Sequence, residues 1–281
     1  MILLSFLISV TFGVAPNLSD DFSHQYLSST ERGADGNVMT YPCMPSPMGL
    51  DYDTNLGLFW QATENDGWVY TVNPDDGTYT QRFNVSCVFN QPNLNTNGVY
   101  YDASNNYLYL TDYQGDAGIL FNDAIYCFDV DDPDSPVLVD YWDVGTLNGI
   151  AGISYKAPYF YCTFIYGHEF RIYTLNSGGT FTLEDSWESY YGGLCYNETW
   201  NVFYTHAALG STAYVLDGDD PSLILDSYMP DAIMSCGMAP DPDPAYLWTS
   251  HLTPAYNSII DNEYIPAPLT RTTWGDIKRI F

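Results

Sequence analysis

The sequence predicts an all-β protein: a five-bladed β-propeller of four-stranded antiparallel blades, closed by an N-terminal strand. Three observations support this prediction, namely 26 tyrosines, five spaced glycines and the strand-like segments that follow each glycine. Tyr is typical of half-buried sheet surfaces, where its ring packs and its hydroxyl remains hydrated. Hydrophobic residues make up 46% of the 281 residues, which is ample for a core.

Five short segments repeat along the chain, each beginning with Gly and an apolar residue, and four of them have Tyr three positions after the Gly. The glycines are Gly49, Gly98, Gly152, Gly193 and Gly237. Their spacings of 49, 54, 41 and 44 residues bracket a four-stranded propeller blade of roughly 40–50 residues. Because one blade cannot bury both of its faces, we expect five blades to pack around a central channel.

The segments after each glycine are typical of the other three strands of a blade. A turn rich in Asp, Asn, Gly or Pro precedes a second apolar strand, in which a Thr recurs. The recurring residues are Thr63, Thr111, Thr163, Thr205 and Thr249. A third strand then ends at Asn or Asp, and a tight turn leads to a mostly alternating fourth strand, such as 137–142.

The fifth copy lacks a full last strand, because only residues 263–265 precede Pro266. We therefore expect a segment between Asp20 and Tyr41 to complete that blade, which leaves no sheet edge open. The propeller is predicted to cover residues 20–266.

Both ends of the chain differ from the repeat. Residues 1–15 are apolar, too short to span a bilayer comfortably, and end in the small residues Gly13 and Ala15, as a signal peptide removed on export does. The alternative is a retained segment that inserts into a neighbouring chain. Residues 267–281, with three of the seven basic residues, are predicted to form a short helix capped by Thr272 or Thr273. This helix would dock on the acidic body or act as a sorting signal.

The charge balance excludes two classes of partner. Seven Lys and Arg stand against 35 Asp and Glu, a formal net charge of −28. A nucleic-acid binder needs a basic surface to displace counterions from phosphate, and an anionic membrane surface would be repelled for the same reason. Three explanations of the charge stay open: solubility with Asp-rich turns, binding of multivalent cations, and adaptation to salt.

Two stretches also carry a family resemblance. Residues 49–83 (GLDYDTNLGLFWQATENDGWVYTVNPDDGTYTQRF) resemble the repeat of secreted bacterial propellers of the YVTN-like, NHL-like and glutaminyl-cyclase-like groups. Residues 125–142 (IYCFDVDDPDSPVLVDYW) are similar to the LVIVD repeat of bacterial and archaeal surface proteins. The resemblance covers roughly residues 43–265 and implies a propeller fold and an extracellular or cell-surface location, but no particular chemistry.

Export would permit disulfides and glycosylation. Six Cys allow fifteen pairings, and those inside predicted strands are equally suited to be buried free thiols. Asn84 and Asn197 lie in sequons and are candidate glycosylation sites, and a third sequon begins at Asn17, just after residues 1–15.

The candidate ligand-binding site is a ring of residues that follow the recurring Thr. In a propeller, the connections from second to third strands share one face with those that lead to the next blade. The ring there consists of Glu64, Asp112, Phe164, His206 and His251, the last after Ser250. These positions differ between blades while the Thr column repeats, and divergence within a repeated scaffold indicates function. With Asp66, Tyr113 and His168 they are predicted to form a shallow pocket at the channel mouth.

Several chemistries fit this ring. Glu64 and Asp112 could act as the carboxylate pair of a glycoside hydrolase or lyase, or the acids and two His could hold a divalent metal. The third alternative is that these residues cap loops. Calcium is a further candidate at the Asp-rich stretches 51–57, 129–132 and 217–220, although Asp is equally favoured there as a turn residue.

These observations favour a non-enzymatic protein without a cofactor. We predict that it binds a protein or carbohydrate partner or self-associates into a layer or filament, without binding nucleic acid. No membrane span is expected in the mature chain.

Overall fold

A computed structural model describes residues 39–64, 67–89, 95–112, 123–145, 148–208, 212–229, 236–252, 255–262 and 264. The chain divides into two units, 1–32 and 33–281, and every described residue belongs to the second.

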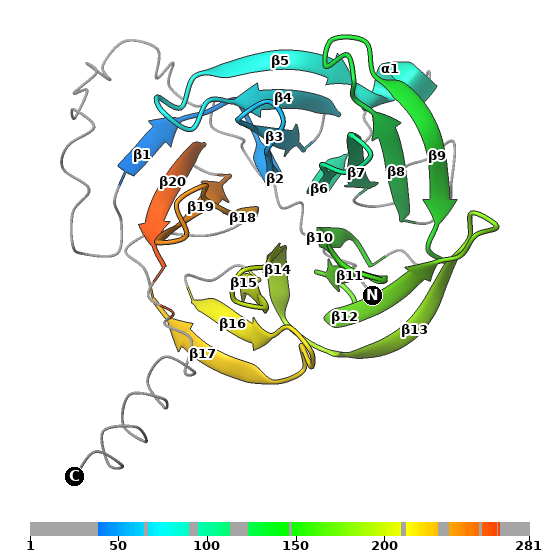
Figure 1. Cartoon of the computed structure of the whole chain (residues 1–281), viewed down its shortest axis with the longest axis vertical. Helices are drawn as coiled ribbons and strands as arrows, with labels where there is room; N and C mark the ends of the chain where they lie inside the picture. Colours follow the sequence, from blue (N-terminus) through cyan, green and yellow to red (C-terminus); the bar gives the residue numbers. More distant parts are fainter. Residues whose placement is uncertain are drawn as a thin grey trace, which may run out of the picture. The chain divides into compact units, whose positions relative to one another are not determined.

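The described residues hold five four-stranded antiparallel sheets, which are arranged as blades around one axis (Figure 1). Blade 1 contains β2 (Pro47–Asp53), β3 (Leu58–Thr63), β4 (Trp68–Val72) and β5 (Tyr79–Asn84). Blade 2 contains β6 (Thr96–Asp102), β7 (Tyr107–Asp112), β8 (Ala124–Asp129) and β9 (Val137–Asp143). Blade 3 contains β10 (Ile150–Lys156), β11 (Tyr159–Phe164), β12 (Glu169–Leu175) and β13 (Phe181–Glu188). Blade 4 contains β14 (Tyr191–Asn197), β15 (Val202–Ala207), β16 (Ala213–Asp217) and β17 (Ile224–Tyr228). Blade 5 contains β18 (Met238–Pro240), β19 (Tyr246–His251), β20 (Tyr256–Asp261) and β1 (Met39–Pro42), and a short helix, α1 (Val85–Phe89), follows β5.

The predicted fold and its closure by an N-terminal strand are confirmed. β1 pairs with β20, from Met39 opposite Ile259 to Pro42 opposite Tyr256, so it lies at the end of the segment expected to supply it. The outer strand of blade 5 is therefore β1. Of residues 263–265, which the sequence suggested as a short last strand, only Tyr264 is described, and it lies outside the sheet.

The ring is held together by five hydrophobic clusters, one at each junction between neighbouring blades. At the junction of blades 5 and 1, for example, Phe59 packs on Trp248 with ring centroids 4.7 Å apart. Both side chains are fully buried, and burial of each contributes about 2–3 kcal/mol. A reciprocal amide pair, Gln61 with Asn257 at 2.8 and 2.9 Å, adds a buried polar link across the same junction. Each blade thus buries its faces only against its neighbours, as the repeat predicted.

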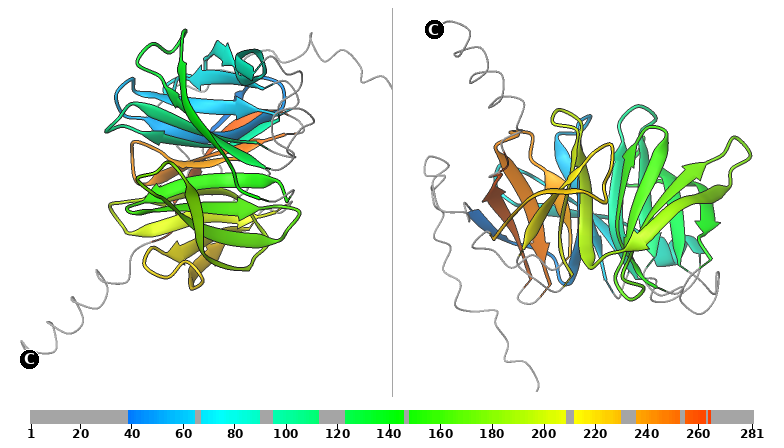
Figure 2. Two further views of the ribbon diagram at one scale, coloured as in Figure 1. Left: turned by 90° about the vertical axis from the view of Figure 1, so that its right-hand side faces the viewer. Right: turned by 90° about the horizontal axis from the view of Figure 1, so that it is seen from below.

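The connections between strands gather at two opposite faces, because every neighbouring pair of strands is antiparallel (Figure 2). We call upper face the one with the connections from second to third strands and from each outer strand to the next blade. The lower face has the connections from first to second and from third to fourth strands. The predicted ring of site residues follows the second strands and therefore lies toward the upper face.

Candidate functional site

The inner strands β2, β6, β10, β14 and β18 surround the axis and meet through their glycines (Figure 1). A Cβ atom added at Gly49 would lie 2.3 Å from the carbonyl oxygen of Asn97. One added at Gly193 would lie 2.5 Å from the carbonyl oxygen of Cys236. The space enclosed by these strands at this level is too narrow to admit a water molecule. The channel expected at the axis is therefore closed here, because residues without side chains let the backbones of neighbouring blades come into contact.

The strand register corrects the column of recurring Thr. We call the inner-strand glycines Gly49, Gly98, Gly152, Gly193 and Gly237 the axial glycines. The residue opposite each of them on the second strand lies thirteen positions later in four blades and eleven positions later in blade 3, whose first turn is two residues shorter. In blades 1 to 5 this residue is Ala62, Thr111, Thr163, His206 and Ser250. The Thr alignment is thus one residue out of register in blades 1, 4 and 5. It failed because Thr63, Thr205 and Thr249 lie directly beside the column position in these blades, and matching the residue type hid the shared thirteen-residue spacing.

Polar side chains at this level link the blades around the axis. The Thr111 hydroxyl accepts a hydrogen bond from the Gly98 amide (2.7 Å) and donates one to the Ile150 carbonyl of blade 3 (3.2 Å). Ser250 repeats this arrangement between the Gly237 amide and the Met48 carbonyl of blade 1, both at 2.7 Å. The remaining hydroxyl links run from Thr163 to the Gly192 carbonyl and from Thr96 to the Thr63 carbonyl. These contacts satisfy backbone groups that would otherwise be buried without a partner.

His206 belongs to this structural column and not to the divergent ring. It is fully buried, and burial lowers the pKa of its imidazole, so the ring is neutral. Its Nε2 accepts a hydrogen bond from the Gly193 amide (2.8 Å), which places the proton on Nδ1, 3.0 Å from the Ala207 carbonyl. In blade 4 the imidazole therefore accepts the glycine amide, as Thr111 and Ser250 do in their blades, but its proton is donated within blade 4 and not to the next blade.

Two other ring residues are also engaged in the interior. Phe164 is fully buried in the core between blades 2 and 3, and the guanidinium of Arg171 lies 4.5 Å from its ring centroid. Asp112 is 2% exposed and accepts a hydrogen bond from the Tyr126 hydroxyl at 3.0 Å. Neither side chain presents a free face to a ligand in this conformation.

Glu64 and His251 complete the predicted ring. Glu64 follows β3 and is half-buried, while His251 ends β19 and stacks on Tyr256 with ring centroids 4.7 Å apart. The five residues thus come from five different blades at the upper ends of the second strands. Asp66 and Tyr113 lie outside the described residues. Within the described ranges, no three His, Cys, Asp or Glu side chains are grouped as metal ligands.

The Asp-rich turns considered for calcium use their side chains on their own backbone. Asp53 accepts the amides of Asn55 and Leu56 at 2.8 Å and the indole N–H of Trp60 at 2.8 Å. Further oxygens of this kind accept an amide two or three residues ahead, at Asn73, Asp76, Asp102, Asp129, Asp132, Asn197, Asp217, Asp220, Asp241 and Asp243. Such local bonding is the reason that turns favour Asp and Asn. Calcium binding stays a prediction.

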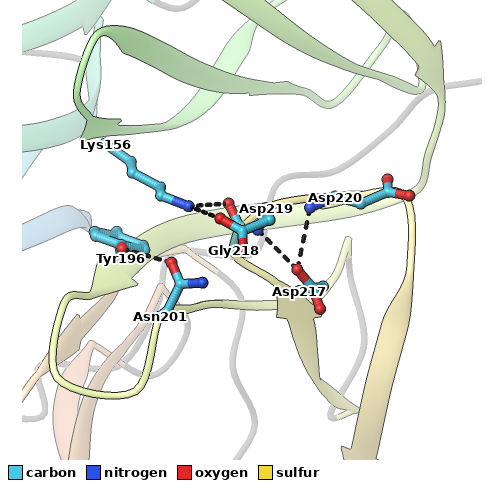
Figure 3. Close-up of polar contacts among 7 residues, drawn as sticks. All are labelled: Lys156, Tyr196, Asn201, Asp217, Gly218, Asp219 and Asp220. Atoms are coloured by element: carbon cyan, nitrogen blue, oxygen red, sulfur yellow. Dashed lines mark hydrogen bonds and ion pairs between the residues drawn. The ribbon is translucent and has the colours of Figure 1, made fainter.

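Blade 3 departs from this pattern on the lower face. The position four residues after the axial glycine is Asp or Asn in the other blades, but Lys156 here. Its ammonium group reaches blade 4, where it donates to the Gly218 carbonyl (2.7 Å) and to Asp219 (2.6 Å) (Figure 3). The Lys156 ammonium also lies over the ring of Tyr196, whose hydroxyl donates to Asn201. The cluster therefore links blades 3 and 4, and its polar groups form hydrogen bonds with one another.

Asp51 is a buried acid that the ring prediction missed. It lies on inner strand β2 two residues after Gly49, and its Oδ2 accepts the Tyr101 amide of blade 2 at 2.8 Å. Although the residue keeps some exposed surface, its carboxylate is enclosed, and burial raises its pKa to about 7 despite that hydrogen bond. Protonation near neutral pH is the property of an acid–base group, but the geometry is that of a blade junction.

The cysteines and the sequons have defined environments. Cys43, Cys127, Cys162 and Cys195 are free thiols in this structure, and all of these but Cys43 are buried, as is Cys236. Asn84 ends β5 and is half-buried. Asn197 ends β14, is 7% exposed and accepts the Trp200 amide at 3.1 Å.

An exposed group of side chains lies on the upper face of blade 3 and includes His168, which the sequence placed at the predicted pocket. Tyr190, which is 56% exposed, lies against His168 with ring centroids 4.5 Å apart, and its hydroxyl donates to Glu188 at 3.0 Å. The aromatic run 187–191 between two predicted strands is the sequence feature that marks this group, and it suits sugar stacking or protein contact.

Comparisons with known proteins support the fold alone. No protein-family model and no curated protein sequence matches the chain. Among solved structures, glutaminyl cyclase from Myxococcus xanthus has a TM-score of 0.58 at 13% identity, covering 80% of this chain and 95% of that one. A PQQ-bound aldose sugar dehydrogenase from Streptomyces coelicolor has a TM-score of 0.53 at 10% identity, with coverage of 82% and 99%. A luciferin-regenerating enzyme gives 0.53 at 9% identity, with coverage of 81% and 96%. No helix in the described part of the chain is long and apolar enough to cross a membrane. The chain is a five-bladed β-propeller, and at these identities the likeness extends no further.

Proposed function

We propose that this chain is a secreted or surface-attached propeller that binds a protein or glycan partner through its upper face and does not catalyse a reaction. The observation that carries the proposal is the closed axis. A catalytic site inside the channel, at the level of the axial glycines, needs a space in which substrate meets reactive groups, and that level is too narrow to admit even water.

The state of the predicted ring supports the same function. His206 holds an inner strand, Phe164 fills a blade junction, and Asp112 is buried beneath the surface. Exposed side chains on the upper face, such as Tyr166 and Tyr190, remain for contact with a partner. Exposed Tyr is enriched where proteins bind macromolecules.

Export is the second part of the proposal. It is supported by the signal-like residues 1–15 and by the resemblance to secreted propeller repeats of the YVTN, NHL and LVIVD kinds. N-terminal sequencing of the protein recovered from its natural host tests it. Cleavage near Ala15 in an extracellular or surface fraction is expected, and a cytosolic protein that retains Met1 would contradict it.

The binding function is tested by measuring both affinity and turnover against a panel of extracellular proteins and polysaccharides. We expect saturable binding to at least one member, no release of reducing ends, and unchanged binding in Glu64→Gln and Asp112→Asn. Turnover that is lost in either variant would instead establish a glycoside hydrolase or lyase. Absence of saturable binding across the panel would also count against the proposal.

A further inference from the structure

We propose that His168, Glu169, Glu188 and Tyr190, here called the blade 3 patch, bind a cationic Arg or Lys side chain of a protein partner. This inference rests on the proposed binding function and names the chemistry of one contact. It is carried by a juxtaposition of like charges, by an exposed aromatic pair and by the charge of the whole protein.

The first observation is a pair of acids placed directly opposite each other. In the β12–β13 register, Glu169 is the partner of Glu188, so their Cβ atoms are about 5 Å apart on one face of the sheet. Like charges in this arrangement destabilise a sheet. Arg171 binds Glu169 through two of its nitrogens, and Glu188 accepts the Tyr190 hydroxyl. One negative charge of the pair therefore lacks a neutralising cation within the patch.

The second observation is the aromatic pair beside these acids. The His168 and Tyr190 rings meet at 33° with centroids 4.5 Å apart, and both residues are exposed. The hydrogen bond to Glu188 raises the pKa of the Tyr190 phenol, which keeps the ring neutral and its hydroxyl a donor. An aromatic face next to a carboxylate is a favourable environment for guanidinium or ammonium, through cation–π attraction and a charged hydrogen bond.

The backbone holds these groups in place at a local cost. His168 has φ of 51°, a left-handed conformation that a residue with a Cβ adopts at about 1 kcal/mol or more. Its carbonyl accepts the Ser189 amide at 2.8 Å, which ties the β11–β12 connection to the segment that carries Tyr190. The strained backbone at His168 and the opposed carboxylates of Glu169 and Glu188 thus lie at the same exposed place. Neither feature stabilises the fold.

The third observation is the charge of the surroundings. Of the 35 acidic residues, 30 lie between residues 39 and 264, with only three basic residues in that span. Those three, Arg82, Lys156 and Arg171, are each paired with an acid. The field around the patch therefore attracts cations, and the described residues offer no further Lys or Arg to supply one. The same field disfavours a second copy of the body, so we assign the site to a basic partner.

The test uses the full chain with its four histidines labelled at carbon ε1, because His168 then reports on the patch while His206 and His251 report on the interior. The probe is N-acetyl-arginine amide, and N-acetyl-citrulline amide is its neutral counterpart. We expect a saturable shift of the His168 signal with arginine, at millimolar affinity, and no saturable shift with citrulline. Glu188→Gln should weaken the arginine effect about tenfold, since it removes the charged partner.

A matched control separates the site from the general field. Glu184→Gln removes the same charge from an exposed position on the same strand and should change the affinity less than about twofold. Equal weakening by Glu184→Gln and Glu188→Gln, or an equal effect of citrulline, would overturn the proposal. So would a His168 shift with a methyl glycoside but not with arginine, which would assign the patch to a glycan.

The two proposals can fail separately. Arginine binding at His168 with no partner in the panel would leave the patch standing and count against the binding function. In the opposite case, a partner binds Glu188→Gln with unchanged affinity and the His168 signal does not respond to arginine. This result would support the binding function and contradict the proposed role of the blade 3 patch.

Discussion

The lower and upper faces are built from opposite ends of the same strands, yet their polar side chains are used differently. On the lower face, Asp or Asn recurs four residues after the axial glycine in four blades, and each of these side chains accepts a hydrogen bond from its own turn. On the upper face the corresponding strand ends differ from blade to blade, and blade 3 exposes an aromatic and acidic patch. The comparison teaches that repetition identifies structural positions reliably, whereas divergence identifies function only when the register is correct. His206 diverges from Thr and is still structural.

The largest effect is expected from breaking the closed axis between the two faces. Gly49→Ala would place a Cβ atom 2.3 Å from a carbonyl oxygen of blade 2, and this contact can be relieved only by moving backbone. We expect a loss of about 3 kcal/mol or more in the free energy of unfolding, measured with urea. Gly178→Ala, in a lower-face turn with nothing within 4 Å of its added Cβ, should change stability by less than about 1 kcal/mol. Similar losses in both variants would show that the glycines do not form a contact ring.

The second effect is a pH dependence that arises at the junction of blades 1 and 2. Because the Asp51 pKa is raised from 3.8 to about 7 on folding, the native state binds the extra proton between these values. The stability this group contributes is complete below about pH 4 and is lost as pH rises to about 7. Asp51→Asn keeps an acceptor for the Tyr101 amide but cannot ionise, so its stability relative to the wild type should rise by about 2 kcal/mol or more over that interval.

Asp76→Asn is the control for that measurement. Hydrogen bonds from Thr78 lower the Asp76 pKa, so this exposed carboxylate stabilises the fold at higher pH and loses that effect as pH falls. The stability of Asp76→Asn relative to the wild type should therefore fall as pH rises, which is opposite to the behaviour expected of Asp51→Asn. A flat difference between Asp51→Asn and the wild type would contradict the buried carboxylate.

The third effect concerns the hydrogen bonds around the axis. Ser250→Ala would leave the Gly237 amide and the Met48 carbonyl without their hydroxyl partner in the interior, at a cost of about 1–2 kcal/mol. Ser250→Thr should stay within about 0.5 kcal/mol of the wild type, because Thr111 has the same role in blade 2. Thermal unfolding monitored by near-ultraviolet circular dichroism distinguishes the two. A Thr variant as unstable as the Ala variant would refute the equivalence of the two positions.

The smallest effect is expected on the lower face, where groups are exposed. Lys156→Met removes the bond to the Gly218 carbonyl and should cost about 0.5–1 kcal/mol. The coupling of Lys156 to Asp219 in a double-mutant cycle with Asp219→Asn should be small and should vanish at about 0.5 M salt, since Asp219 is exposed. A coupling that persists in high salt would mean that the tie is shielded from solvent.

Much of the fold was predictable from local signals. The glycine spacing gave the number of blades, because each axial position requires a residue without a side chain. Turn residues such as Asp129 and Asp217 located the hairpins, since their chemistry is local. The closing strand was predicted from the incomplete fifth blade, and β1 lies where that argument placed it.

The candidate site was less predictable, because its properties depend on contacts between blades. The thirteen-residue distance from glycine to the column residue, shared by four blades, was present in the sequence, but the match to Thr concealed it. The burial of Asp112 and Phe164 follows from packing against neighbouring strands, which no single repeat encodes. The opposition of Glu169 and Glu188 requires the β12–β13 register, which a bulge near Ile172 shifts.

The central claim is that the axis is a closed structural element and that binding occurs at the upper face. Hydrogen exchange at the axial glycines tests this claim most directly. The amides of Gly98, Gly193 and Gly237 donate to Thr111, His206 and Ser250, and the space between the strands is too narrow to admit water. We predict that these three amides exchange only through global unfolding, as slowly as the most protected strand amides. Exchange as fast as that of exposed turns would show a water-filled channel and would return the axis to consideration as a catalytic site.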